Sequence, residues 1–269
     1  VIVTAGAKMA LFELFQALVE PGDEVVLLSP YWPSYPEMVA LAGGVTVVVP
    51  THGADRFRPD PAALRRALSP RTRLVLLNSP SNPTGAVFDR ATLESIAEVL
   101  APTDALVVSD DIYERITFDG RTAPTFTQLG PEWRARTVVV NGASKAFAMT
   151  GFRIGWACGP APVIAAMGRI QDQSTSNPTS IAQYGALAAL QGPQEPVEAM
   201  RRAFERRRDL LHAGLVSIDG VACARPEGAF YAFADLRALL ARRGASVPVP
   251  ADEASFAGWL MEHHGVVVV

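Results

Sequence analysis

The sequence is poor in the residues that build disulfide frameworks and metal centres. Its 269 residues include only two cysteines and four histidines, and neither set has the spacing of a metal-binding motif. The cysteines, Cys158 and Cys223, stand far apart, which is typical of reduced residues in a cytoplasmic protein. We therefore expect no metal site, and we expect a cytoplasmic location.

The sequence also lacks long apolar runs and a marked excess of one charge. No run is long enough to span a bilayer, and no secretory signal pattern opens the chain. Lys and Arg number 24 and Asp and Glu number 27, so the formal net charge is −3. We therefore expect neither nucleic acid nor a membrane as a partner.

Both ends of the chain fall in β-branched segments. Val1 opens one such segment, and residues 266–269 are four valines that read as a strand with no turn after it. Because domains rarely begin and end inside strands, we expect an internal fragment of a longer protein.

Short β-branched runs alternate with longer helical stretches in most of the chain. The expected strands are residues 24–29, 45–50, 74–78, 105–109, 137–141 and 153–158, and helices are expected at 8–19, 61–68 and 89–100. The strands are nearly continuous apolar runs, as when helices cover both faces of a sheet. The pattern predicts an α/β fold of three α/β/α layers with a mostly parallel mixed sheet, and ligands at the carboxyl ends of strands.

The pattern changes from about Pro178. Helices are expected at 181–190 and 195–215, and the second carries arginines that we interpret as a solvated face because acidic residues interleave them: Arg201, Arg202, Arg206, Arg207 and Arg208. Strands at 221–224 and 229–234 and a helix at 253–262 then indicate part of a small α+β domain. The predicted division is a large domain at 1–192, a connecting helix at 193–216 and a partial small domain at 217–269.

One lysine occupies an unusual setting. Lys145 directly follows a buried strand in a run of small residues, and Arg153 lies eight positions later. Small neighbours let a bulky group approach, and apolar surroundings lower the pKa of a lysine toward the nucleophilic amine. The guanidinium of Arg153 offers a fork of donors suited to a phosphate.

Three further segments end strands of the same predicted sheet. Asp110 and Tyr113 follow one strand, and Asn82 stands in a rigid turn after another. Residues 4–8 link a strand to a helix through Gly6, where free backbone N–H groups make an anion site. Alone, each has an ordinary explanation: a helix cap, a plain loop, a glycine turn.

Together these segments resemble the class I and II aminotransferases of fold type I. The motifs are SKxFxMxGxRxG from Ser144 to Gly155, NPTG at residues 82–85 and SDxxY at 109–113. Within the family, residues 29–36 and 142–153 are most similar to the bacterial aspartate/prephenate aminotransferase branch.

The resemblance implies that pyridoxal 5′-phosphate is the cofactor. Lys145 would carry it as a Schiff base and move a proton between the substrate Cα and the cofactor C4′, while Asp110 and Tyr113 would complete the catalytic set. Asp110 would pair with the ring nitrogen, and Tyr113 and Asn82 would bond its 3′ oxygen. The implied cofactor-binding residues are Gly6, Ala7, Lys8, Trp32, Asn82, Asp110, Tyr113, Ser144, Lys145 and Arg153, and the implied substrate-binding residues are Lys8, Trp32 and Asn82.

Two assignments stay open. The side chain of Lys8 either meets the distal carboxylate of a dicarboxylic substrate or is a surface lysine in a first helical turn. Phe230 and Tyr231 either belong to a segment that closes over the substrate or pack in the core.

The resemblance implies ping-pong transfer of an amino group from aspartate or glutamate to a 2-oxo acid, and a homodimer. Two alternatives share the scaffold: another pyridoxal phosphate enzyme, such as a C–S β-lyase or ring-closing synthase, and the effector domain of a transcription regulator. The family's arginine for the substrate α-carboxylate would lie beyond Val269, and its N-terminal segment is also missing. We therefore expect weak turnover from this chain.

Overall fold

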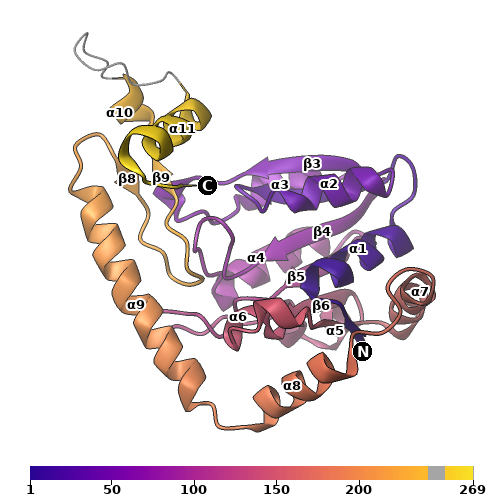
Figure 1. Cartoon of the computed structure of the whole chain (residues 1–269). Helices are drawn as coiled ribbons and strands as arrows, with labels where there is room; N and C mark the ends of the chain where they lie inside the picture. Colours follow the sequence, from indigo (N-terminus) through magenta and orange to yellow (C-terminus); the bar gives the residue numbers. More distant parts are fainter. Residues whose placement is uncertain (242–251, 269) are drawn as a thin grey trace.

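A seven-stranded sheet forms the centre of the protein (Figure 1). The computed structural model describes residues 1–241 and 252–268. The strand order is β1-β7-β6-β5-β4-β2-β3. The strands are β1 (Ile2–Thr4), β2 (Glu24–Ser29), β3 (Val45–Pro50), β4 (Thr72–Asn78), β5 (Leu106–Asp110), β6 (Thr137–Gly142) and β7 (Gly155–Cys158).

The sheet is mixed but mostly parallel. Strand β7 pairs antiparallel with β1 and with β6, whereas β6, β5, β4, β2 and β3 pair in parallel. The parallel strands therefore end at the same edge, which is where ligands bind in such sheets. The predicted strands 24–29 and 45–50 are confirmed with their bounds. The other four strands predicted for this sheet, at 74–78, 105–109, 137–141 and 153–158, are found with bounds that differ by one or two residues.

Helices on one face of the sheet cover alternate residues of its strands. α1 (Ala7–Leu18), α2 (Ser34–Leu41) and α7 (Ala161–Asp172) pack there. Val25 and Leu27 of β2 point into this layer and are fully buried. Side chains alternate between the two faces of a strand, so the residue between Val25 and Leu27 points to the opposite face. If helices cover both faces, that residue must meet a second helical layer.

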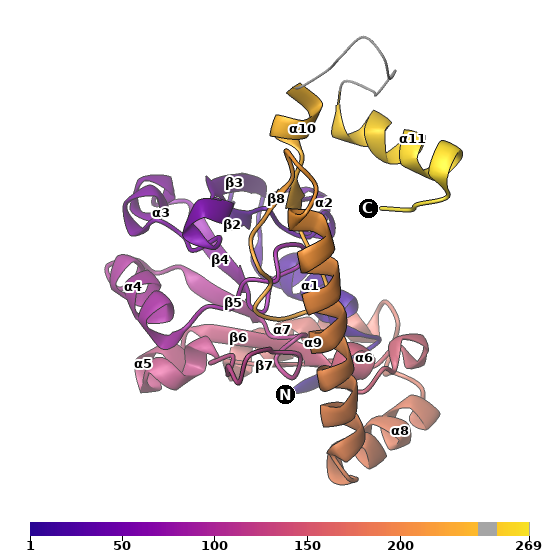
Figure 2. The same ribbon diagram turned by 90° about the vertical axis from the view of Figure 1, so that its left-hand side faces the viewer.

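That second layer is formed by α3 (Pro61–Ala67), α4 (Arg90–Leu100) and α5 (Pro131–Arg134), which lie along one side of the sheet in Figure 2. Val26, between the two residues that face the first layer, packs here. Each fully buried side chain of this type contributes about 1.5–3 kcal/mol by leaving water. The three-layer α/β fold predicted from the sequence is confirmed.

The start of α1 differs from the starts of α3 and α4. Asp60 and Asp89 accept hydrogen bonds from backbone N–H groups in the first turns of α3 and α4. By contrast, α1 follows Gly6, which has no side chain, and its first turn holds no acidic residue. The N–H groups of Met9 and Ala10 donate to the Gly6 carbonyl, and those of Ala7 and Lys8 are left for another acceptor.

The C-terminal part continues from α8 (Ser180–Gln191) into the long helix α9 (Glu195–Val216), which runs along the molecule to a small sheet (Figure 1). That sheet pairs β8 (Ala222–Cys223) with β9 (Ala234–Asp235) in antiparallel fashion. α10 (Arg237–Ala241) and α11 (Glu253–His264) follow it. No helix among the described residues is long and apolar enough to cross a membrane.

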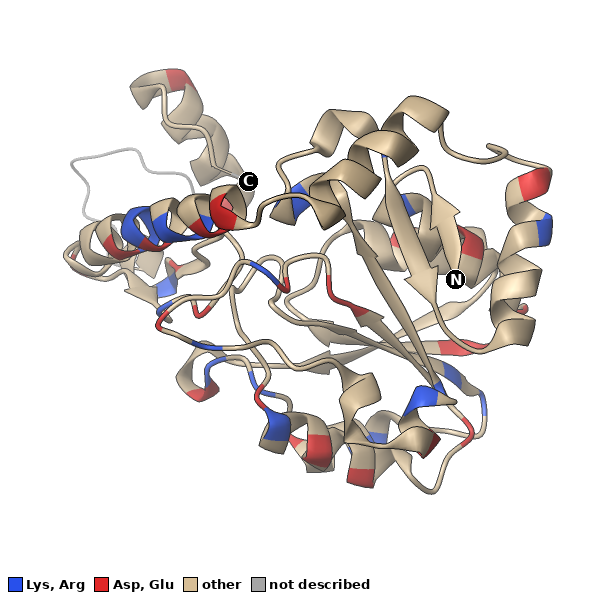
Figure 3. Ribbon diagram, turned by 90° about the horizontal axis from the view of Figure 1, so that it is seen from below, with Lys and Arg blue, Asp and Glu red and all other residues tan. Residues whose placement is uncertain are grey.

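The arginines of α9 alternate with acidic residues, as Figure 3 shows along the helix. Arg201 pairs with Glu198 and Glu205, and Arg202, Arg206 and Arg207 of this helix are accessible to solvent. Arg208 contradicts the predicted solvated face, since it is buried. Its guanidinium bonds the Asp119 carboxylate and the carbonyl of Pro226, which helix periodicity alone does not reveal.

Several boundaries differ from the sequence predictions. The strand predicted at 229–234 is wrong except for its last residue, because Ala229 has a φ of 57°, which breaks extended pairing. Residues 266–268 are exposed and not in a strand, and position 269 lies outside the described residues. β7 starts at Gly155 rather than at 153, because the 3₁₀ helix η3 (Thr150–Phe152) and Arg153, with a φ of 53°, precede it.

Further short elements had no counterpart in the predictions. Their dependence on local turns rather than on a long apolar period explains this. Besides α2, α5 and α10 they are η1 (Gly53–Asp55), η2 (Phe126–Leu129) and α6 (Ala143–Ala146). The sequence predictions also missed α7, a helix of 12 residues that packs against the sheet.

Candidate active site

The residues singled out in the sequence gather around one cavity at the carboxyl ends of β4, β5 and β6. Its volume is about 220 Å³. The predicted residues that line it are Ala7, Lys8, Trp32, Asn82, Asp110, Tyr113, Ser144, Lys145 and Arg153. Gly6 lies next to the guanidinium of Arg153. The structure thus brings residues from five separate segments of the chain to one place.

Asp110 lies at the end of β5 and is almost fully buried. Burial raises the pKa of its carboxyl to about 6, and hydrogen bonds from Tyr35 and from the backbone N–H of Ile112 oppose that rise. The charge of Lys145 also lowers the pKa. A buried carboxylate held in this way has room to pair with a cationic group inside the cavity.

The sequence predictions missed two residues of the site: Tyr35, which bonds the Asp110 carboxylate, and Asn78, which bonds the backbone of Asp110 and of Asn82. The Tyr35 hydroxyl donates a 2.7 Å hydrogen bond to Asp110 Oδ2. Asn78 donates through Nδ2 to the Asp110 carbonyl at 2.9 Å, and its Oδ1 accepts from the N–H of Asn82 at 2.7 Å. Asn78 could have been suspected, because it ends a strand, whereas nothing local marks Tyr35.

Lys145 belongs to α6, the single turn of helix that follows β6. Burial lowers the pKa of its amine, the nearby Arg153 charge adds to this effect, and Asp110 acts in the opposite direction. Its Nζ lies 5.8 Å from the ring centre of Tyr113 and 5.4 Å from that of Phe230. Burial and Arg153 thus shift Lys145 toward the uncharged, nucleophilic amine, whereas Asp110 and the two ring faces act in favour of the ammonium form.

The start of α1 and Arg153 form an anion cradle. Gly6 has a φ of 89°, and a Cβ added there would lie 2.5 Å from Arg153 Nη2. A side chain at position 6 would therefore displace the guanidinium from its present place at the helix start. Arg153 is itself held by a 2.8 Å hydrogen bond from Nη1 to the carbonyl of Thr150. Together with the first N–H groups of α1, it offers donors to a phosphate-like group.

Two tyrosines meet on another side of the cavity. The hydroxyl oxygens of Tyr113 and Tyr231 lie 2.6 Å apart. The pKa of Tyr113 is raised, chiefly by burial and then by Tyr231, while Asn82 lowers it. Tyr231 lines the cavity, whereas Phe230 stacks on Phe204 with ring centres 5.4 Å apart. Phe230 is 38% exposed and is therefore not a core residue, and the role of this pair in a segment that closes over the substrate stays a prediction.

Lys8 lies at the cavity with its side chain exposed. Its Nζ is 4.6 Å from the ring centre of Trp32, which in turn meets Tyr35 edge to face at 5.3 Å. The cation is thus held over an indole face at the mouth of the cavity. Both predicted roles of Lys8, substrate ligand and surface lysine, are compatible with this position.

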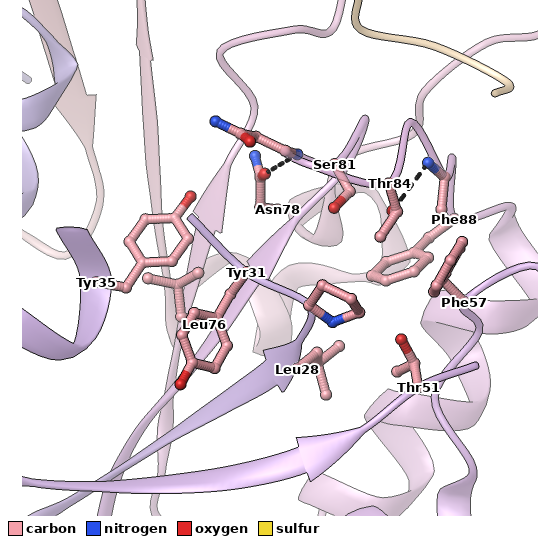
Figure 4. Close-up of a pocket in the computed structure, with 13 residues that line it drawn as sticks. Leu28, Tyr31, Tyr35, Thr51, Phe57, Leu76, Asn78, Ser81, Thr84 and Phe88 are labelled. Atoms are coloured by element: carbon pink, nitrogen blue, oxygen red, sulfur yellow. Dashed lines mark hydrogen bonds between the residues drawn. The ribbon is translucent and has the colours of Figure 1, made fainter. Parts of the chain in front are cut away.

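A second, smaller cavity of about 20 Å³ lies beyond Asn78. Figure 4 shows Tyr35 and Tyr31 on one side of it and Thr51 and Phe57 on the other. It has room for about one water molecule. The two cavities share Tyr35, Asn78 and Asn82, so these side chains form the wall between them.

The described residues contain no group of three or more His, Cys, Asp or Glu side chains that could hold a metal ion. Their two cysteines are unpaired, and Cys158 is exposed. The donor set of the large cavity consists instead of cations, backbone N–H groups, hydroxyls, amides and one buried acid. Such a set suits an organic phosphate with a basic ring.

Known proteins share this architecture and sequence. The aspartate aminotransferase of Geobacillus stearothermophilus is 50% identical over 244 residues, which cover 91% of this chain and 62% of that protein. The aspartate/prephenate aminotransferase of Thermus thermophilus is 48% identical over 271 residues, covering 100% of this chain and 66% of the relative. The chain therefore spans about two thirds of the length of these curated relatives.

The solved structures agree. The crystal structure of the aspartate aminotransferase from Rhizobium meliloti superposes with a TM-score of 0.94 at 43% identity, covering 99% of this chain and 67% of that one. The family described as aminotransferase class I and II matches residues 1–269. The chain belongs to the class I and II aminotransferase family.

Proposed function

We propose that the protein acts as a pyridoxal 5′-phosphate-dependent aminotransferase, which moves an amino group from aspartate or glutamate to a 2-oxo acid in two half-reactions. The single observation that carries the proposal is the shared cavity of Lys145, Asp110 and the anion cradle at Gly6 and Arg153. An amine nucleophile, a buried acid and a phosphate site are the three groups that this cofactor requires.

The residues present fit the cofactor. Gly6 leaves space beside Arg153 that a Cβ would fill, and the first N–H groups of α1 have no side-chain cap, which suits a phosphate. The buried carboxylate of Asp110 suits a protonated ring nitrogen, and Lys145 suits an aldehyde carbon. When bound, the cofactor supplies an electron sink for the pair released at the substrate Cα.

The chain's own residues would then perform three tasks. Lys145, with its lowered pKa, accepts and returns the proton of the substrate Cα. Asp110, ionised above a pKa of about 6 and oriented by Tyr35, keeps the ring nitrogen protonated. Asn82 and Tyr113 would donate hydrogen bonds to the ring's 3′ oxygen, and Trp32 and Ser144 line the cavity that would hold it.

An acidic amino donor is the substrate class we propose. The relatives' names specify aspartate, and in one case aspartate/prephenate. Lys8 supports the proposal, because its exposed ammonium beside Trp32 at the mouth of the cavity can meet a distal carboxylate. The competing chemistry, a C–S β-lyase, would share the cofactor contacts but cleave a bond at Cβ.

We also propose that the whole protein is a homodimer. α8 exposes four apolar side chains, some of which a second copy would cover: Ile181, Tyr184, Leu187 and Leu190. A cytoplasmic location and the division into domains at 1–192, 193–216 and 217–269 remain predictions.

The test is an absorption spectrum of the purified protein with pyridoxal phosphate, before and after adding aspartate. We expect a visible band that Lys145→Ala lacks and that disappears with aspartate as oxaloacetate is released. Release of pyruvate and ammonia from a sulfur-containing amino acid would favour the lyase instead. A folded protein that forms no band would rule out the cofactor assignment.

A further inference from the structure

Glu227 has a buried carboxylate that touches three distant segments. Only 5% of the residue is exposed. Its Oε1 lies 3.2 Å from Arg121 Nη2 and 3.4 Å from Arg56 Nη1. Its Oε2 accepts a 3.3 Å hydrogen bond from the N–H of Val87. One side chain thus joins the segment after β3, the loop after β4 and the loop after β5.

The backbone around Glu227 joins the same two loops. We call residues 79–87 the Asn82 loop and residues 111–121 the Tyr113 loop. The N–H groups of Glu227 and Gly228 both donate to the carbonyl of Gly85 in the Asn82 loop, at 2.8 and 2.9 Å. On the other side, Phe118 N–H donates to the Glu227 carbonyl at 2.9 Å, and Ala229 N–H donates to the Ile116 carbonyl at 2.8 Å.

The fit between these segments leaves little freedom. A Cβ on Gly85 would lie 2.6 Å from Pro226 Cβ, and a Cβ on Gly228 would lie 2.8 Å from the Ile116 carbonyl oxygen. Residues 226–229 are therefore wedged between the two loops. The chain then continues directly to Tyr231, whose hydroxyl meets that of Tyr113 at 2.6 Å.

We propose that Glu227 is a positioning residue for the cofactor site: it locks the Asn82 loop to the Tyr113 loop, so that the Asn82 amide and the Tyr113 phenol face one cavity. The proposal rests on the proposed function for the identity of the group these two side chains hold. The coupling between the loops does not depend on that function, because it follows from the contacts of residues 226–229 with both loops.

Glu227→Gln is the test variant, because the amide keeps the size of the side chain and an oxygen acceptor for Val87 but loses the charge that pairs with Arg56 and Arg121. Glu24→Gln is the matched control. Glu24 is also buried and paired with an arginine, Arg71, at 3.0 Å, but it lies at the opposite end of β2 from the cavity. A general cost of losing a buried ion pair would affect both variants.

The first measurement is amide hydrogen exchange of the cofactor-free protein. We expect exchange in the Asn82 and Tyr113 loops to accelerate about tenfold in Glu227→Gln and to stay at the wild-type rate in Glu24→Gln. Glu227→Asp, which keeps the charge on a shorter side chain, should restore part of the protection. Wild-type rates in both loops of Glu227→Gln would mean that the backbone contacts of residues 226–229 hold the loops together without this charge, and would overturn the role proposed for Glu227.

The second measurement is the pH midpoint of the visible band formed with pyridoxal phosphate. Hydrogen bonds from Asn82 and Tyr113 stabilise an anionic 3′ oxygen, so loosening them should raise the midpoint by about half a pH unit in Glu227→Gln only. Faster exchange with an unmoved midpoint would reduce Glu227 to a structural role and refute positioning. If the wild type forms no band, the proposed function fails with the cofactor part of this inference, and hydrogen exchange still decides the coupling.

Discussion

The hydroxyl of Tyr35 donates a 2.7 Å hydrogen bond to Asp110 Oδ2, and both side chains are buried. Tyr35 comes from α2 and Asp110 from the end of β5, so the bond joins a helix of one layer to the central sheet. Burial raises the pKa of Asp110 to about 6, and the tyrosine opposes that rise by stabilising the carboxylate. The ionisation state of the buried acid therefore depends on a residue 75 positions away.

Tyr35→Phe should weaken the cofactor site without unfolding it. Removing the donor raises the pKa of Asp110 further, and a hydrogen bond to a charged group is worth about 1.5–3 kcal/mol. We expect pyridoxal phosphate affinity to fall about tenfold near pH 7 and the loss to shrink at higher pH, where Asp110 is ionised in both proteins. Fluorescence titration measures it. Tyr31→Phe, the same change on a half-buried neighbour, should bind as the wild type does.

Gly6→Ala should destroy the anion cradle. The new Cβ would lie 2.5 Å from Arg153 Nη2, and the φ of 89° strains any L side chain. We expect the dissociation constant for pyridoxal phosphate to rise at least about tenfold, since Arg153 must move from the start of α1. Gly22→Ala separates the two effects, because Gly22 has a φ of 91° but open space around it. That control should lose about 1 kcal/mol of stability and no affinity. Equal affinities for wild type and Gly6→Ala would refute the cradle.

Arg208→Ala should destabilise the attachment of α9. Arg208 is buried and bonds the Asp119 carboxylate and the Pro226 carbonyl, which lies next to Glu227. Breaking a buried ion pair from one side costs about 3–5 kcal/mol, and the partly exposed Asp119 places the cost near the low end. Urea unfolding measures the change. Arg206→Ala, on an exposed position of the same helix, should stay within about 0.5 kcal/mol of the wild type.

The strands and the motif residues were predictable because their signals are local. Val25, Val26 and Leu27 form a continuous apolar run, and such a run indicates a strand buried on both faces. Asp110 ends one such strand, and Asn82 and Lys145 follow the ends of two others within four residues. Parallel strands end at one edge of the sheet. The convergence of these three side chains on one cavity thus follows from topology.

The missed features depend on contacts between distant segments. Tyr35 is one apolar residue of a short helix in the sequence, and only the packing of α2 on the sheet aims it at Asp110. Arg208 reads as part of a charged face until the turn at Asp119 covers it. Ala229 has a φ of 57°, and residues 226–229 are wedged between two loops. Intrinsic strand propensities do not include such contacts between distant segments.

Glu13 provides a prediction about stability and pH. This residue of α1 is fully buried, and neither carboxylate oxygen has a hydrogen-bond partner. Burial raises its pKa from 4.5 to about 7, and Gln171 on α7 slightly opposes the rise. Because the folded state holds the proton more tightly than the unfolded chain, the protonated acid favours folding at low pH. That contribution is lost as the pH rises from about 4.5 through 7.

Glu13→Gln removes the charge at nearly constant shape. We expect it to raise the free energy of unfolding by about 2 kcal/mol at pH 8 and to change it little at pH 4, where the wild-type carboxyl is already neutral. Urea unfolding of both proteins across this range measures the difference. For Glu20→Gln, at an exposed position after α1, the difference from the wild type in free energy of unfolding should be the same at pH 4 and pH 8. A Glu13→Gln gain that is the same at both pH values would mean that the folded protein and the unfolded chain hold the Glu13 proton equally tightly, so that burial does not raise its pKa.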